Sequence, residues 1–179
     1  MHSKYLFHEK LNINTYCSRF IRLFTGTGAE QLLKGTKTER SGNMIIYKTI
    51  FYHNNLFVTK IARDNKIARI DKISKTQYTI TTDQFSSYSL LENGSKLYFI
   101  FKEFLRQDNM LKNVELGNGY IVELDGAGNQ KKSITQPVEG DNNLMLWPVT
   151  SIPVSGNELI YSTVSLDYKD YVINKLTVK

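Results

Sequence analysis

The segment Leu97–Phe101, with the sequence LYFIF, is apolar at every position. Side chains of a β-strand point alternately to the two faces of its sheet, so a strand with one wet face alternates apolar and polar residues. A strand with apolar side chains on both faces of its sheet must be packed against other structure on both faces. The segment therefore predicts an inner strand of a sheet that packs against further sheets.

From Asn43 onward, apolar runs of strand length alternate with turn residues. The aromatic fraction is 12%, and the aromatic residues stand among many Ile, Val and Thr, which fit a pleated, half-buried surface. We therefore predict an all-β domain over residues 43–179, with a hairpin between Ile61 and Ile73 that turns at Asp64-Asn65. The runs are MIIYKTIFY, LFVTKIAR, KIARIDKIS, QYTITT, YSLL, LYFIFKEFL, YIVEL, LMLWPVTSIPV, ELIYSTVSL and DYVINKLTV.

Residues 1–42 lack this pattern. The segment Ile13–Phe24 spaces its aromatic and apolar side chains as one face of a helix would. GAEQLLKG, Gly28–Gly35, predicts a short helical turn between two glycines, and the polar segment Gly35–Gly42 predicts a loop. We expect a short mixed N-terminal segment over residues 1–42, partly helical or disordered, ahead of the β domain.

An internal repeat divides the β domain. LLENGSKLYFIF aligns without gaps with IPVSGNELIYST, which places Gly94 on Gly156 and Leu97 on Leu159. A weaker copy, TIFYHNNLFVTK, places Leu56 on Leu97, and each copy precedes a second strand (NKIARIDK, NGYIVELDGAGN and KDYVINKLTVK). Repeated antiparallel hairpins that cover one another predict a partial β-propeller-like arrangement, with a β-sandwich as the alternative.

The same segments carry a resemblance to a known group. NGSKLYFIFKEFLRQDN, NGYIVELDGAGNQKKSI and NELIYSTVSLDYKDYVINKLTVK resemble the C-terminal blades of large exported propeller-like proteins of Bacteroidetes-type bacteria, most of them of unknown function. The resemblance covers roughly residues 43–179 and implies a propeller-like fold, export to the periplasm or cell surface, and a longer N-terminal part. The start MHSKYLFHEK lacks the apolar stretch of a signal peptide, so we expect a truncated or shortened relative that is soluble as written.

Two glycine-containing motifs are interpreted as turns. ELDGAGNQKK, Glu123–Lys132, has the composition of a phosphate or metal loop but the spacing of neither a P-loop nor an EF-hand. Gly126 and Gly128 both permit a positive φ between two strands, so a hairpin turn is preferred. The NGS motif at Asn93 matches a glycosylation acceptor, and a hairpin turn is preferred there too.

No cofactor or metal site is expected. Gly26 and Gly28 stand before a predicted helical turn as in a dinucleotide loop, but Gln31 occupies the position of the third glycine. Cys17 is the single cysteine, so neither an intrachain disulfide nor a multi-cysteine metal site can form. The three histidines share no ligand spacing, and the last of them is interpreted as a turn residue before Asn54-Asn55; they are His2, His8 and His53.

No catalytic set stands out. Six carboxylates could supply a pair for glycoside hydrolysis, but nothing selects two of them, and surface charge is the preferred interpretation. They are Glu92, Glu103, Glu123, Asp125, Asp167 and Asp170. The only tryptophan, Trp147 in LMLWPVTS, is a candidate ligand contact as a sugar-stacking platform, but packing against Leu144, Leu146 and Val149 is preferred.

The net charge of the chain does not identify the class of its partner. Lys and Arg number 23 against 17 Asp and Glu, a net charge of +6, which permits contact with a polyanion without demanding it. The densest basic stretch, residues 60–75, includes Asp64 and Asp71, so we favour a solvated strand surface, and no nucleic-acid-binding motif accompanies it. The longest apolar run is far shorter than the ~20 residues that span a bilayer, so no transmembrane segment is expected.

From these observations we expect a non-catalytic binding or scaffolding module with a protein or glycan partner. Repeat-built β-sheets hold loops on a rigid frame, and no assembled catalytic set accompanies them. The alternatives are a fragment of a carbohydrate-active enzyme, whose carboxylates come together only in the fold, and a basic polyanion-binding protein.

Overall fold

The computed structural model describes residues 25–41, 44–62, 64–80, 85–108, 113–136, 144–165 and 167–179. Within these residues the regular structure is entirely β, with eleven strands in three antiparallel sheets, so the all-β prediction is confirmed. Sheet A holds β1 (Thr25–Ser41), β2 (Met44–Ile61), β3 (Ile67–Ile73) and β4 (Tyr78–Ile80). Sheet B holds β5 (Ser89–Asn93), β6 (Lys96–Asp108), β7 (Asn113–Leu124) and β8 (Gln130–Gln136), and sheet C holds β9 (Leu144–Ser155), β10 (Glu158–Ser165) and β11 (Tyr171–Thr177).

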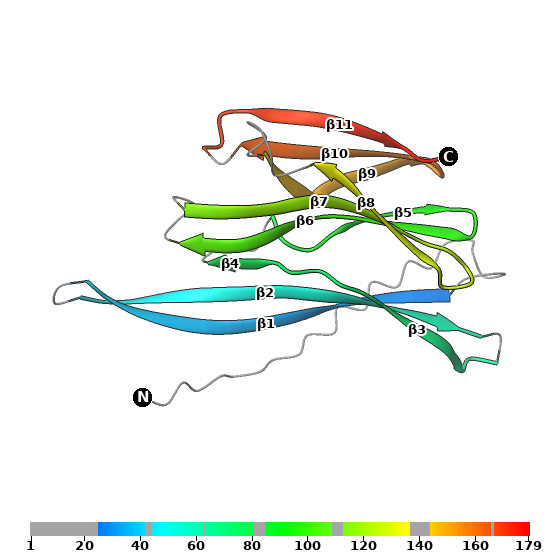
Figure 1. Cartoon of the computed structure of the whole chain (residues 1–179), viewed down its shortest axis with the longest axis horizontal. Coiled ribbons are helices and arrows are strands. Elements are labelled where there is room, and N and C mark those ends of the chain that lie inside the picture. Colours follow the sequence, from blue (N-terminus) through cyan, green and yellow to red (C-terminus); the bar gives the residue numbers. More distant parts are fainter. Residues whose placement is uncertain are drawn as a thin grey trace.

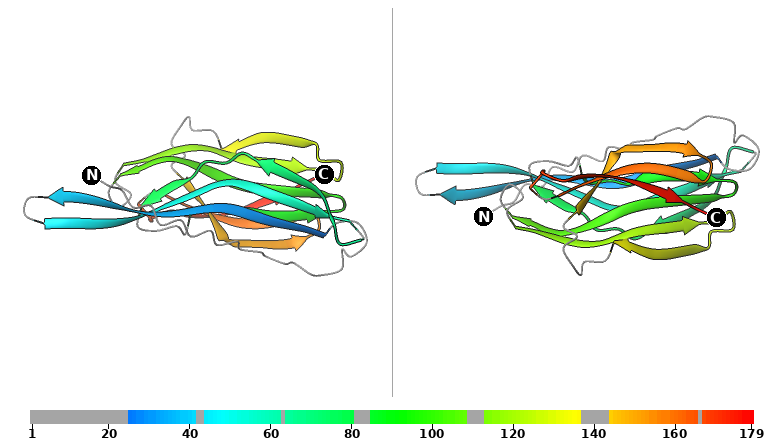
Figure 2. Two further views of the ribbon diagram at one scale, coloured as in Figure 1. Left: turned by 90° about the horizontal axis from the view of Figure 1, so that it is seen from below. Right: turned by 90° about the horizontal axis from the view of Figure 1, so that it is seen from above.

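The three sheets lie one above another in chain order (Figure 1). Sheet B is a simple meander in the order β5-β6-β7-β8, and sheet C has the order β11-β10-β9. In sheet A, β2 pairs with β1 along its whole length and with β3 and β4 on its other side. The C-terminal end of β1 and the N-terminal end of β2, which pair with each other, project beyond the other two sheets (Figure 2).

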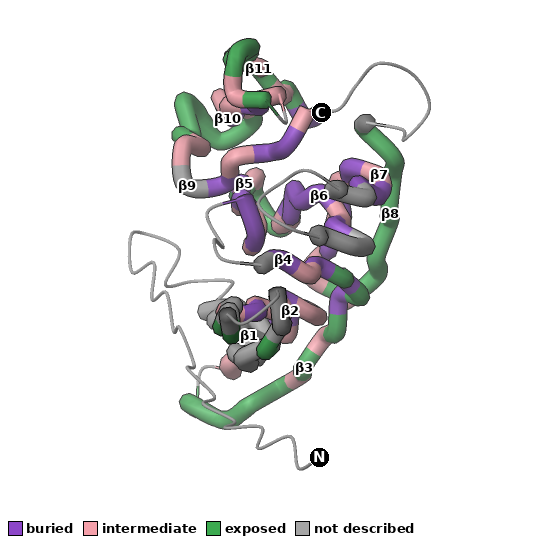
Figure 3. Tube along the Cα trace, turned by 90° about the vertical axis from the view of Figure 1, so that its left-hand side faces the viewer, coloured by how far each residue is buried: buried purple, intermediate pink, exposed green. Residues whose placement is uncertain are grey.

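Strand β6 is buried on both faces, as predicted from LYFIF. Phe99 and Phe101 pack against Leu56, Val58 and Ile73 of sheet A. The alternate side chains, Tyr98 and Ile100, pack against Leu146, Leu159 and Val178 of the C-terminal layer. The middle layer is therefore covered by a sheet on each side, and β6 is buried in Figure 3 while β8 and β11 are mainly exposed.

The repeat corresponds to real structural units in sheets B and C. Hairpin β5–β6 turns at Gly94-Ser95 with Asn93 opposite Lys96, and hairpin β9–β10 turns at Gly156-Asn157. Gly94 adopts a φ of 59°, a conformation open to glycine without strain, so the turn interpretation of the NGS motif is confirmed. A third strand follows each hairpin: β7 in sheet B and β11 in sheet C.

The hairpin predicted between Ile61 and Ile73 is also confirmed. Ile61 lies opposite Ile67, and the Ala62 amide donates to the Lys66 carbonyl oxygen at 2.8 Å. Asn65, in the predicted turn, has a φ of 63°, which asparagine tolerates better than most residues.

The helical turn predicted for Gly28–Gly35 and the loop predicted for Gly35–Gly42 are wrong, because β1 runs from Thr25 to Ser41. An isolated helix of so few residues is marginal, whereas pairing with β2 along the whole segment supplies hydrogen-bond partners for the backbone groups that face β2. The β-structure thus includes residues that were assigned to the mixed N-terminal segment. The helical spacing predicted over Ile13–Phe24 lies outside the described residues.

The tight turn expected at His53-Asn54-Asn55 is wrong as well. Strand β2 continues from Met44 to Ile61, and β1 pairs with both halves of it. The asparagines produce an irregularity instead of a turn, since Asn55 has a φ of 21° and the pairing shifts at Glu30/Gln31. The weaker copy of the repeat therefore lacks the tight turn of the other two.

Candidate functional site

The last five residues of the motif LDGAGN, Asp125–Asn129, form the connection between β7 and β8. Oδ1 of Asp125 accepts from the amides of Ala127 at 2.9 Å and Asn129 at 2.8 Å, and Oδ2 accepts from Nδ2 of Asn129 at 2.8 Å. These bonds, with the Asn129 side chain first, lower the pKa of Asp125 because they stabilise its carboxylate. The carboxylate is engaged inside the loop, and the hairpin-turn prediction is confirmed.

The turn also joins two sheets. Its Gly126 carbonyl oxygen accepts from Nζ of Lys60 at 3.0 Å and from Nη1 of Arg69 at 3.5 Å, both from sheet A. Gly128 has a φ of 92°, and a Cβ there would lie 2.6 Å from the guanidinium carbon of Arg69. The positive φ favours glycine at this position, and a Cβ would also displace the flexible end of the Arg69 side chain.

Two lysines of the described residues are buried, Lys75 in the connection between β3 and β4 and Lys102 in β6. Lys75 is 2% exposed, and its ammonium donates to Oε1 of Gln77 at 2.7 Å and to the Ser87 carbonyl oxygen at 3.3 Å. Burial lowers the pKa of Lys75 well below its usual value, since apolar surroundings disfavour the charged form. The prediction of a solvated strand surface over residues 60–75 is therefore wrong for Lys75, although Lys66 and Lys72 are exposed.

Gln77 links Lys75 to Lys102 through hydrogen bonds. Its Nε2 donates to the backbone carbonyl oxygen of Lys102 at 2.6 Å, and its Oε1 accepts from the Ser87 amide at 2.7 Å. The Lys102 side chain is also buried, and its Nζ donates to the Leu144 carbonyl oxygen at 2.7 Å. Burial lowers the pKa of Lys102 to about 8. This network connects residues of all three layers through hydrogen bonds.

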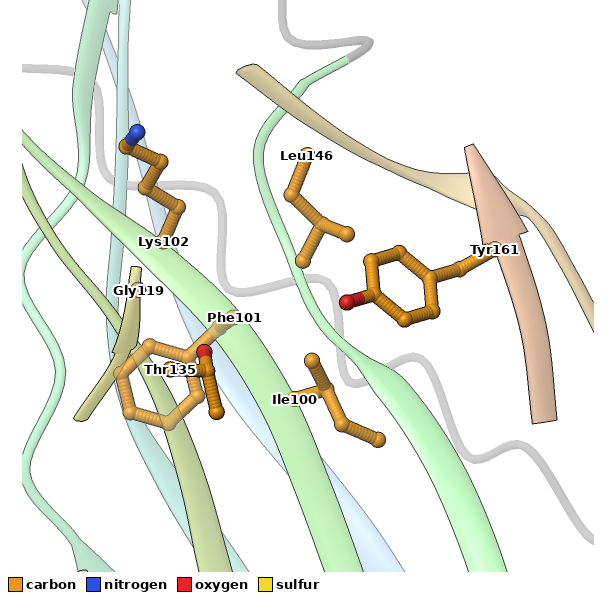
Figure 4. Close-up of a pocket in the computed structure, with 7 residues that line it drawn as sticks. All are labelled: Ile100, Phe101, Lys102, Gly119, Thr135, Leu146 and Tyr161. Atoms are coloured by element: carbon orange, nitrogen blue, oxygen red, sulfur yellow. The ribbon is translucent and has the colours of Figure 1, made fainter. Parts of the chain in front are cut away.

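A small cavity adjoins Lys102. It has a volume of about 10 Å³, room for roughly one water molecule, and lies between β6 and residues of β7 to β10. Figure 4 shows the Tyr161 hydroxyl directed into this region, with the Lys102 nitrogen directed away from it. Burial raises the pKa of Tyr161, so this phenol stays protonated at neutral pH. A sugar or nucleotide does not fit this cavity.

Trp147 lies in an aromatic cluster. Its ring is 5.6 Å from that of Phe85 in an edge-to-face arrangement and 6.4 Å from that of Tyr171, and Phe85 also contacts Tyr168. Trp147 packs partly buried against the core formed by Met145, Val164 and the residues around them. The indole is thus held by other rings, in line with the preferred packing interpretation, although its partners differ from those expected.

The candidate carboxylates lie in separate local arrangements. Glu123 pairs with Lys96 at 2.6 Å, and Glu103 lies 3.7 Å from Lys132. Asp167 accepts from the Ser165 hydroxyl at 2.6 Å and pairs with Lys169 at 3.1 Å, and the Ser165 bond leads the interactions that lower its pKa to about 2. The structure describes no contact that brings two of the six candidate carboxylates together across a cleft.

The glycines and histidines give no assembled site in the described part of the chain. Gly26 and Gly28 lie within β1, and a strand follows them where a dinucleotide loop has a helix. His53 is 6% exposed in β2, and its backbone amide donates to the Gln77 carbonyl oxygen, so its assignment to a turn is wrong. His2, His8 and Cys17 lie outside the described residues. Among those described, no group of three His, Cys, Asp or Glu side chains could hold a metal ion.

The most distinctive surface is on sheet C. Cross-strand partners share a face, and the register places Ile152, Ile160 and Lys175 together, with Ile173 beside Ser162. Leu159 and Leu176 point the other way, into the core shared with sheet B. We call the side away from that core the outer face of sheet C. Its exposed apolar residues are Ile152 (62%), Tyr171 (58%) and Ile173 (76%), and the exposed Val154 (55%) lies at the register shift next to Ile152.

Sequence reasoning missed both the buried lysines and this outer face. Lys102 directly follows the doubly buried LYFIF, which is a signal that its stem continues into the interior. The consecutive apolar residues Tyr171-Val172-Ile173 near the end of the chain predict a strand, and their exposure in the structure shows that neither face of this segment is fully covered.

Comparison with protein-family models, with curated proteins and with solved structures found no match to this chain. Among the described residues, no helix has the length and apolar character needed to cross a membrane.

Proposed function

We propose that this chain is a non-catalytic binding or scaffolding module that engages a protein or glycan partner through sheet C. We further propose that its sheets form part of a propeller-like arrangement, related to the C-terminal blades of exported proteins of Bacteroidetes-type bacteria. The stacking of small antiparallel sheets and the repeated hairpins support this arrangement.

The observation that carries the binding proposal is the apolar outer face of sheet C. Ile152, Tyr171 and Ile173 each expose more than half of their surface, and the register places them on one face. Single exposed apolar residues are ordinary, but several that share one sheet face favour an interaction surface. The sheet beneath them is anchored by Leu159, which is fully buried, so the surface is presented on a rigid support.

The local roles of the carboxylates favour binding over glycoside hydrolysis. Hydrolysis needs two carboxyl groups roughly 5 to 10 Å apart on either side of a glycosidic bond. Glu123 is engaged with Lys96, and Asp125 and Asp167 are engaged within their own turns. These three carboxylates therefore each have a structural partner that accounts for their positions.

A retention experiment with a matched control tests the proposal. The wild-type chain and an Ile152→Asp/Ile173→Asp variant are immobilised and exposed to soluble and envelope extracts of the source cells. Ile67→Asp/Ile70→Asp, which alters two exposed isoleucines of sheet A, serves as the control. We expect a set of proteins or glycans that the wild type and the control retain and the sheet C variant does not. Equal retention by all three chains, or cleavage of a polysaccharide by the wild type, would contradict the proposal.

A further inference from the structure

We infer that the free edge of β11 accepts an extended peptide strand from a partner protein, with an acidic residue opposite Lys175 and an apolar residue opposite Ile173. The strand would lie antiparallel to β11 in sheet C, at the position equivalent to that of β8 beside β7 in sheet B. This inference rests on the proposed function, because it assigns a partner chemistry to sheet C.

The comparison of sheets B and C shows an unoccupied strand position. Leu97 lies opposite Leu124 in β6–β7, and Leu159 lies opposite Leu176 in β10–β11, so the first three strands of each sheet correspond. Sheet B continues with β8, which pairs with β7 from Leu124 onward. Among the described residues, β11 has β10 as its strand neighbour and nothing on its other edge.

The first part of the free edge, Tyr171–Ile173, lacks the usual protection against pairing, and Lys175 is the one charged residue of the strand. Tyr171, Val172 and Ile173 are consecutive and exposed by 58%, 40% and 76%. The pairing of β11 with β10 continues without a register shift, and the strand contains no proline. Natural edge strands are commonly blunted by proline, bulges or charge, so an unblunted apolar stretch is a template for strand addition.

The charges of the two sheets indicate which strand would fit. Lys96 of β6 pairs with Glu123 of β7 at 2.6 Å, and the equivalent residues Glu158 of β10 and Lys175 of β11 also pair at 2.6 Å. The acidic and the basic residue have therefore exchanged strands between sheet B and sheet C. In sheet B, the basic Lys131 of β8 lies opposite Glu123. The equivalent position opposite Lys175 therefore calls for an acidic side chain, because opposite charges across a strand pair are favourable.

The same register gives an apolar requirement opposite Val172, whereas Ile121, the equivalent of Ile173, lies opposite Ser133, so the requirement opposite Ile173 rests on its exposure. Ile134 of β8 lies opposite Tyr120, whose equivalent in sheet C is Val172. Ile173 is the most exposed of the three consecutive apolar residues on the edge strand. An apolar side chain beside each of these residues would remove apolar surface from water. The partner segment is thus an extended strand that combines one acidic residue with neighbouring β-branched residues.

A synthetic hexapeptide with both ends blocked tests the inference directly. Its sequence is Gln-Glu-Thr-Val-Ile-Thr, written from the position opposite Leu176, so that Glu faces Lys175, Val faces Ile173 and Ile faces Val172. Binding to the full chain is measured by fluorescence anisotropy of a labelled peptide and by amide chemical-shift changes. We expect the changes to centre on β11 and to reach β10 less strongly. The same peptide with N-methylvaline in place of Val should not bind, because the backbone of Ile173 faces the free edge and the methylated amide opposite it cannot donate to the ladder.

Charge exchange provides the matched control. A Glu158→Lys/Lys175→Glu chain keeps an ion pair and takes the polarity of Lys96 and Glu123. The wild type should bind the Glu peptide about fivefold more tightly than the corresponding Lys peptide, and the exchanged chain should reverse that preference. If the ion pair between residues 158 and 175 has only a structural role, the charge exchange will not change which of the two peptides binds more tightly.

Three outcomes would overturn the inference: no binding of the Glu peptide, binding that the charge exchange leaves unchanged, or chemical-shift changes away from β11. Self-pairing of two copies through β11 would also overturn it, and would appear as a concentration-dependent dimer that Ile173→Asp dissociates. If the peptide fails while the Ile152→Asp/Ile173→Asp chain still loses partners that the control retains, the proposed function survives and the edge assignment does not.

Discussion

Phe99 and Ile100 are neighbours in the chain but lie in two different cores, Phe99 against sheet A and Ile100 against the C-terminal layer. They are 1% and 4% exposed. Alternating side-chain directions place the two residues on opposite faces of β6, and each face is covered by another sheet. The middle strand thus contributes to two interfaces at once, and loss of either side chain affects a different one.

Truncation of either residue should therefore be costly. We expect Phe99→Ala to lower the free energy of unfolding by about 3 to 5 kcal/mol and Ile100→Ala by about 2 to 5 kcal/mol, since each leaves a buried cavity. Urea denaturation followed by tryptophan fluorescence measures both. Ile134→Ala on the exposed strand β8, where Ile134 is 58% exposed, is the control and should change stability by about 0.5 kcal/mol or less. A loss at Phe99 with none at Ile100 would show that β6 is covered on one face only.

Gly128 and Gly94 offer a paired test of the turns. Both have positive φ, but a Cβ at Gly128 would lie 2.6 Å from Arg69, whereas a Cβ at Gly94 would meet nothing within 4 Å. Gly94→Ala should cost about 1 to 2 kcal/mol from backbone strain alone, and Gly128→Ala should cost more. Thermal unfolding of the two variants gives the order. Addition of Arg69→Ala should bring the cost of Gly128→Ala down to that of Gly94→Ala.

Asp167 should contribute to stability above its folded pKa. Its pKa falls from the ordinary 3.8 to about 2, first through the Ser165 hydroxyl and then through Lys169. A carboxyl with a lowered folded pKa stabilises the fold above pH 3.8, and that contribution is lost as the pH falls toward 2. Asp167→Asn should therefore flatten the decline of the melting temperature across this window. An unchanged acid profile would show that the Ser165 bond does not persist in solution.

Lys102 should give a dependence of the same sign at alkaline pH. Its pKa is lowered by burial from 10.5 to about 8, so between these values the unfolded chain binds more protons than the folded one. Stability contributed by this group then rises as the pH goes from 8 to 10.5. Lys102→Met should remove that part of the rise in urea titrations at several pH values, whereas Lys131→Met, at an exposed site, should leave the profile as it is. If the stability of Lys102→Met rises by the same amount over this pH range, the rise comes from other titrating groups.

The strands and turns that sequence patterns predicted are those with strong local signals. LYFIF could be predicted to be buried on both faces because its composition admits no other stable placement. Asp64-Asn65 and Gly94 lie where short polar turns separate apolar runs, and turn chemistry alone is enough to place them. These are properties of neighbouring residues in the chain.

The features that were missed depend on distant residues. GAEQLLKG has little intrinsic strand preference, and it is extended because β2 offers a partner along its entire length. His53-Asn54-Asn55 stays within β2 because β1 pairs across it. The burial of Lys75 follows from contacts with Ser87 and with Gln77, which itself is tied to β6. No local pattern reports which layer will cover a given side chain.

The consecutive pairing of neighbouring strands has a consequence for biosynthesis. Sheet B and sheet C each pair strands that follow one another directly in the chain. Such local topology closes short loops first, which favours rapid folding, and domains acquire structure from the N-terminus as they leave the ribosome. We expect sheet B to acquire protease resistance on ribosome-bound chains before β9–β11 has been synthesised. Arrested chains of increasing length, treated with protease, would show whether protection appears in these steps or only once sheet C is complete.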